Sequence, residues 1–183
     1  MTEAELISQM KNGDEAAFTQ LINQHYTQVY QLCHRFLANA MDSEEAAQDV
    51  FIQFHRNIGR YQPNAQLSTY LYRLAVNRSL NGLRTRKRKR LFSFNQIQKD
   101  QEWEGNPNDR PDQKLEEAER ARAVRQAIDA LPENQRTAVI LRRYQELSYE
   151  EIADVMNCSV SAVESRLHRA KQTLRKKLNY LTE

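Results

Sequence analysis

The sequence predicts an all-α fold of two small helical domains joined by a flexible acidic linker. Apolar residues recur at three- and four-residue steps along most of the chain, and no alternating pattern is long enough to predict a β-strand. The 183 residues, with only four glycines and four prolines, suit two small domains better than a turn-rich β fold. Residues 93–112 are rich in Asn, Gln and Asp, so we expect domains at residues 1–92 and 113–183 with a linker between them.

Three main helices are predicted in the first domain. Asp14 is a favoured helix cap and precedes a long amphipathic stripe. Ser43 is expected to open the second helix, which has acidic residues near its start, where the helix dipole favours negative charge. After a turn, Asn64 or Ser68 is expected to lead into a long basic helix over Leu67–Arg90.

The second domain is predicted to begin with two helices. Asp112 is expected to cap the first of them, and Pro132 fits the first turn of the next. The apolar face of the first helix is assigned to Leu115, Ala118, Val124, Ile128 and Leu131.

A helix-turn-helix is predicted at the C-terminal end. Ser148 and Glu151 form a capping box that opens a short helix, and Asn157 tolerates the left-handed backbone of a tight turn. Ser161 and Glu164 form a second capping box before a longer basic helix, so the pattern resembles a DNA-reading motif. A structural helical hairpin is the alternative, and Glu164 can serve as a capping residue or as a base contact.

The exposed side of this last helix is the candidate surface for duplex DNA. Arginine prefers guanine and glutamate can accept from cytosine, whereas other basic residues favour phosphates. The residues predicted to face base edges are Ser161, Glu164, Ser165, His168 and Arg169, and those predicted to contact phosphates or to form a solvated flank include Arg166 and Lys171.

Charge is strongly segregated behind a net charge of +3. Residues 61–99 have nine basic and no acidic side chains, and residues 134–183 have nine basic and six acidic ones. Residues 1–60 and 100–133 are net acidic. Two basic blocks separated by an acidic one indicate two separate contacts with a polyanion.

The basic helix also contains amides and aromatic residues. Between Arg84 and Arg90, six of seven residues are basic, and they continue an amphipathic helix that contains Asn77 and Asn81. A solvated face is the plain explanation of such a run. Its continuity with a helix that carries amides and aromatic rings favours contact with a DNA backbone and with unstacked bases.

Other features restrict the range of functions. Cys33 and Cys158 lie in apolar patterns and are interpreted as reduced core thiols, because no spacing matches a zinc site. We expect no metal, cofactor or catalytic residues, since no acid–base cluster is apparent. The N-terminus lacks signal-peptide features and no apolar run could span a bilayer, so we expect a cytoplasmic protein without membrane insertion. The sole tryptophan, Trp103, is interpreted as a docking contact on the protein itself, with a partner contact as the alternative.

Four motifs, in order, resemble the extracytoplasmic-function sigma factors of the bacterial sigma-70 family. The opening stripe (GDEAAFTQLINQHYTQVYQLCHRFL), the acidic helix (SEEAAQDVFIQFHRNI), the basic helix (LSTYLYRLAVNRSLNGLRTRKR) and the C-terminal 131–178 segment each match a region of those factors. The resemblance implies a region 2 bundle at residues 1–92 and a region 4 helix-turn-helix at residues 113–183.

The resemblance also implies partners and roles. Gln48, Asp49 and Phe51 would dock on the β′ clamp helices of core RNA polymerase, and the β flap, promoter DNA and an anti-sigma factor would be further partners. The C-terminal helix would read the minus-thirty-five duplex. The melted minus-ten strand would meet Tyr61, Tyr70, Arg73, Asn77, Arg78, Asn81, Arg84, Arg86 and Lys87.

Three positions depart from the family pattern. Tyr70 stands where tryptophan is usual, Asn81 where aspartate is frequent, and Glu164 where relatives are often basic. We therefore expect altered contacts with DNA at these positions. A helix-turn-helix regulator that binds duplex operators alone is the alternative function, and it differs by needing no polymerase.

Overall fold

The computed structural model describes residues 2–62, 66–92 and 111–179, all in helices and short connections. The chain divides into two compact units, residues 1–97 and 98–183. The division lies within the predicted linker, whose residues 93–110, together with Trp103, lie outside the described residues. No strand occurs in the described ranges, so the all-α prediction with two helical domains is confirmed.

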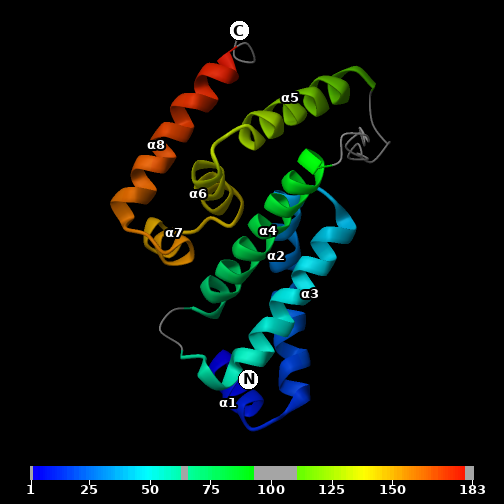
Figure 1. The fold of residues 1–183 in the computed structure, drawn as a ribbon, viewed down its shortest axis with the longest axis vertical. Coiled ribbons are helices and arrows are strands. Elements are labelled where there is room, and N and C mark those ends of the chain that lie inside the picture. The colour runs from blue at the N-terminus through cyan, green and yellow to red at the C-terminus, as the bar shows by residue number, and fades with distance from the viewer. Residues whose placement is uncertain (1, 63–65, 93–110, 180–183) are drawn as a thin grey trace. The chain divides into compact units, whose positions relative to one another are not determined.

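The first unit contains α1 (Glu3–Lys11), α2 (Glu15–Leu37), α3 (Ala40–Asn57), a 3-10 turn η1 (Ile58–Arg60) and α4 (Leu67–Phe92). Helices α2, α3 and α4 pack on one another in pairs (Figure 1). Their core contains Leu21, Leu32, Phe36, Val50, Phe54 and Leu71, each at most 1% exposed. Burial of these side chains, about 1.5–3 kcal/mol each, is the main force that holds α2, α3 and α4 together.

The predicted N-terminal cap is correct for α2 and wrong for α3. Asp14 caps α2 as predicted, since its carboxylate accepts from the amides of Ala16 and Ala17. The prediction that Ser43 opens the next helix is wrong. Asn39 is the cap, and Ser43 lies a turn inside α3, where it is fully buried and bonds back to the Asn39 carbonyl.

The long basic helix begins at Leu67, and Ser68 lies inside its first turn rather than before it. Asn64, the alternative start, falls outside the described residues.

The second unit contains α5 (Pro111–Asp129), α6 (Glu133–Tyr144), α7 (Tyr149–Met156) and α8 (Val160–Lys177). Helix α8 packs against both α6 and α7 (Figure 1). Thr137, Ala138, Ile140 and Leu141 of α6 are buried, as are Ile152 and Val163. This small core orients the start of α8.

Helix α5 differs from its predicted amphipathic form. It begins at Pro111, so Asp112 is inside the helix and not its cap, and Pro132 is the cap of α6 rather than a residue of its first turn. Val124 is 37% exposed, whereas Ala127, Ile128 and Leu131 are buried. Among the described side chains of α5, the predicted apolar face is buried only near the C-terminal end, since Ala118 is exposed, and the side chain of Leu115 lies outside the described part.

Candidate nucleic-acid interface

The first candidate surface is an exposed stripe on α4. Asn77, Asn81, Arg84 and Arg88 are all exposed and follow the i, i+4, i+7, i+11 spacing of one helix face. The stripe is about 16 Å long at 1.5 Å per residue, which is the length of about five 3.4 Å base steps. Two amides followed by two guanidinium groups can hydrogen-bond to base edges at one end and bind phosphates at the other.

Two other cations predicted to contact DNA are held by acidic groups of α3. Arg78 donates through Nε to Asp49 at 2.6 Å and through Nη2 to Glu45 at 3.1 Å. Arg86 pairs with Asp42 and donates to the Leu37 carbonyl at 3.1 Å. These bonds fix the orientation of α4 on α3, and they neutralise part of the charge that the sequence alone suggests is available to DNA.

An aromatic cluster supports the start of α4. Tyr61 is only 6% exposed, and its ring centroid lies 5.0 Å from Tyr70 and 5.6 Å from Phe54. Lys11 donates to the Tyr61 carbonyl at 2.9 Å, and burial together with nearby Glu3 raises the pKa of the Tyr61 phenol. The Tyr61 ring is therefore a packing group in this conformation, while half-buried Tyr70 is the ring nearer to solvent.

Among the other residues predicted to contact the minus-ten strand, Lys87 is exposed and Arg73 is half-buried. The structure thus brings Asn77, Asn81 and Arg84 together on one face and places Tyr61 in the interior.

The outer side of α3 is the second candidate surface. Phe51 is 3% exposed and stacks on Tyr26 with ring centroids 6.1 Å apart, whereas Gln48 is exposed. Met41 and Ile52 are 80% and 47% exposed, and they share one helix face with Gln48 at seven- and four-residue steps. Two exposed apolar side chains on one helix face make this side of α3 a candidate protein-binding surface. Sequence analysis missed both residues because they extend an otherwise polar face.

The helix-turn-helix of the second unit has the predicted turn and one of the two predicted caps. Ser148 and Glu151 form the capping box of α7, and Asn157 adopts φ 48° and ψ 57° in the left-handed region. The second capping box is wrong. Ser159 caps α8 by accepting from the Ala162 amide at 3.2 Å, so Ser161 lies in the first helical turn.

The cap at Ser159 leaves Glu164 without a capping role. Glu164 is exposed, as are the other predicted base-facing residues of α8, namely Ser161, Ser165, His168 and Arg169. His168 is hydrogen-bonded through Nε2 to Gln172 at 2.9 Å. Gln172 is a polar residue of the same face that sequence analysis missed, although it lies four residues after His168.

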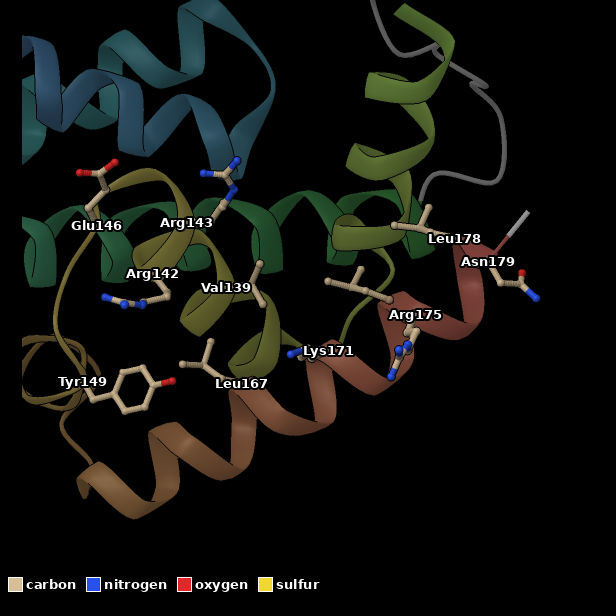
Figure 2. A pocket seen from close by; sticks show the side chains of 11 residues that line it. Val139, Arg142, Arg143, Glu146, Tyr149, Leu167, Lys171, Arg175, Leu178 and Asn179 are labelled. Carbon is tan, nitrogen blue, oxygen red and sulfur yellow. The ribbon is translucent and has the colours of Figure 1, made fainter. Parts of the chain in front are cut away.

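The predicted phosphate contacts of α8 divide into two kinds. Arg166 is half-buried and reaches back across the turn, with Nη1 3.0 Å from the sulfur of Cys158. Lys171 is exposed at the edge of a groove between α6 and α8 (Figure 2). Arg166 therefore ties α8 to the turn, while Lys171 follows Glu164 by seven residues and lies on the same side of α8.

The two cysteines occupy different environments. Cys33 is fully buried, as predicted, and burial raises the pKa of its thiol to about 11. Cys158 is half-buried in the helix-turn-helix turn, so the prediction of a core thiol is wrong there. Within the described ranges, no three potential metal ligands gather, and no helix has the length and apolar character needed to cross a membrane.

Comparison with known proteins assigns both units. The model of sigma-70 region 2 matches residues 21–89, and that of sigma-70 region 4 matches residues 121–174. The ECF RNA polymerase sigma factor SigW of Bacillus subtilis is 32% identical over 96% of both chains. The RNA polymerase sigma-H factor of Pseudomonas aeruginosa is 34% identical over 98% of this chain and 95% of its own.

Solved structures give the same fold. CnrH, in complex with the cytosolic domain of CnrY, superposes with a TM-score of 0.68 at 23% identity over 96% of both chains. The sigma factor RpoE of Bartonella quintana, in complex with the anti-sigma factor NepR, gives a TM-score of 0.69 at 19% identity, covering 88% of this chain and 96% of its own.

Proposed function

The chain belongs to the extracytoplasmic-function RNA polymerase sigma factors of the sigma-70 family, and from this membership we propose that it directs core polymerase to specific promoters and opens their minus-ten element. It acts in the cytoplasm as a binding and melting subunit with no active site of its own. The observation that carries the melting role is the α4 stripe, in which two exposed amides precede two exposed guanidinium groups.

The α4 stripe suits a single strand better than a closed duplex. The Watson–Crick edge of a paired base is occupied by its partner base, whereas an unpaired and unstacked base offers that edge to Asn77 and Asn81. Arg84 and Arg88, about two to three turns further along, would hold the adjoining phosphates. Because Asp49 and Asp42 of α3 hold Arg78 and Arg86, α4 presents this face without having to reorganise when DNA arrives.

Polymerase binding is assigned to the outer side of α3. Met41, Gln48 and Ile52 form an exposed strip with apolar ends, which suits a helical surface such as the β′ clamp helices. Phe51 would act from beneath by supporting the helix through its stack on Tyr26. Asp49 would hold Arg78 rather than act as a free charge toward the polymerase.

The second unit is proposed to bind the minus-thirty-five duplex and the β flap. The exposed start of α8, with Ser161, Glu164 and Ser165, is the part of a recognition helix that enters a major groove. Glu164 favours cytosine through its N4 amine, which would distinguish this promoter from those read by a basic residue. The sigma factor RpoE of Bartonella quintana is bound to the anti-sigma factor NepR, so we include such an inhibitor among the partners.

Reconstitution tests this function. The chain is mixed with purified core RNA polymerase, and the holoenzyme selects binding sites from a random DNA library. We expect co-elution of the chain with the polymerase and run-off transcription from the selected sites. Failure of both, with retained duplex binding by the chain alone, would establish the alternative function of a helix-turn-helix regulator.

A further inference from the structure

The second unit contains an open groove lined mainly by residues of α6 and α8. It has a volume of about 1250 Å³ and lies along α6 and α8 (Figure 2). The floor is apolar and consists of Val139, Leu167, Leu174 and Leu178, all half-buried. Small-molecule sites usually measure about 300–1,000 Å³ and enclose their ligand, so a groove of this size and openness suits a peptide segment.

The rim of the groove is positively charged. Arg142, Arg143, Lys171 and Arg175 line it, against one carboxylate, that of Glu146. Arg142 is held in place, because it donates to the Leu147 carbonyl at 2.7 Å and lies 5.5 Å from the centre of the Tyr149 ring. A peptide that combines a large apolar side chain with several carboxylates would match both the floor and the rim.

We propose that this groove binds the segment Asp100–Glu104 of the same chain, with Trp103 seated on the apolar floor. The segment DQEWE has three carboxylates and no cation around the only tryptophan of the protein. Its charge complements the rim, and an indole ring is the side chain that gains most from burial in such a site.

The length of chain permits this contact. Pro111, where α5 begins, follows Trp103 by eight positions, and this length of chain spans at most about 29 Å when extended. The 19 residues of α5 cover about 28 Å, and α5 contacts both α6 and α8. An extended segment of this length can therefore run back along α5 toward α6 and α8.

Fluorescence of the single tryptophan tests the proposal in the full chain without polymerase. We expect blue-shifted emission and slow quenching by acrylamide in the native chain, independent of protein concentration. Leu178→Glu removes an apolar contact at the end of α8 and adds a repelling carboxylate, so it should lower the docking equilibrium about tenfold or more and expose the ring. Gln172→Glu adds the same charge at an exposed position on the same helix and should leave the emission unchanged.

A second variant separates docking from misfolding. Arg143→Gln with Arg175→Gln changes only exposed side chains, so its circular dichroism and melting temperature should match the native chain while quenching increases. The same increase is expected at high salt, which screens the charges. Equal acrylamide quenching of the native chain and the groove variants would overturn the proposal. Shielding of Trp103 that disappears on dilution would also overturn it, because the tryptophan would then be bound by a second copy of the chain.

Discussion

Arg78 of α4 donates to Asp49 of α3 over 2.6 Å and joins two residues to which sequence analysis gives separate partners. Asp49 is predicted to meet polymerase and Arg78 to meet DNA. The structure pairs them, so each is first of all a structural group that fixes the basic helix. Exposed residues lie close to the pair on each helix, Ile52 on α3 and Asn77 on α4, and these are the residues that we propose to contact the two partners.

This pair should contribute measurably but modestly to stability. The two side chains are 33% and 43% exposed, and partly exposed pairs contribute up to about 1 kcal/mol. In a double-mutant cycle with Asp49→Ala and Arg78→Ala, urea unfolding should give a coupling free energy of about 0.5–1 kcal/mol. A coupling of zero at low salt would show that the pair does not form in solution.

The cap of α8 gives a second prediction. Ser159→Ala should lower the free energy of unfolding by about 1 kcal/mol, because the Ala162 amide loses its acceptor. Ser161→Ala is the matched control inside the first helical turn and should have the smaller effect. A larger loss of stability from Ser161→Ala would show that Ser161 is the cap of α8, as the sequence predicts.

Glu164 provides a prediction of specificity rather than stability. Since Glu164 is exposed and does not cap α8, Glu164→Gln should leave the melting temperature unchanged. It should alter the preferred base at one position of the minus-thirty-five element, with a change of about 1–3 kcal/mol for that base pair. Selection of sites by wild-type and variant holoenzymes measures this change, and identical site preferences would exclude a base contact.

Ile52 should be a contact with polymerase. Ile52→Glu introduces a charge into an exposed apolar position and should weaken association with core polymerase about tenfold or more, as at other interface anchors. Gln53→Glu adds the same charge to the adjacent exposed position and is the control. Equal affinities of the two variants would place the polymerase surface elsewhere.

The buried thiol leads to a prediction about pH. Burial raises the pKa of Cys33 to about 11 from a usual value near 9, so the folded chain keeps the thiol protonated where the unfolded chain ionises it. The resulting stability is complete below pH of about 9 and is lost as pH rises toward 11. Cys33→Ala should show a smaller loss of stability over this interval in denaturant titrations, and an identical loss would contradict the assignment.

The fold was predictable because helical periodicity and most turn signals act locally. Asp14, the Ser148–Glu151 box and Asn157 all have the predicted roles. The caps at Asn39 and Ser159 were missed because another serine stood nearby with acidic residues after it. Asn39 and Ser159 are favoured cap residues as well, so the local pattern did not decide between them and the nearby serines.

The candidate sites were predictable in outline only. Residue type and spacing indicate a basic helix and a recognition helix. Burial of Phe51 and Tyr61 depends on aromatic neighbours from other helices, and the Arg78–Asp49 bond joins residues 29 positions apart. Such contacts become visible only when α3 and α4 are placed against each other.

The most direct test of the central claim is the permanganate reactivity of unpaired thymines in the minus-ten element of a selected promoter. Holoenzyme with the native chain should give strong reactivity. Asn77→Ala should reduce it about tenfold while core binding is unchanged, since a good hydrogen-bonded contact with a base is worth about 1–3 kcal/mol. Asn23→Ala, which changes an exposed asparagine on α2, should open DNA normally. Full reactivity with Asn77→Ala and Asn81→Ala combined, or parallel loss of polymerase binding, would contradict the role assigned to the α4 stripe.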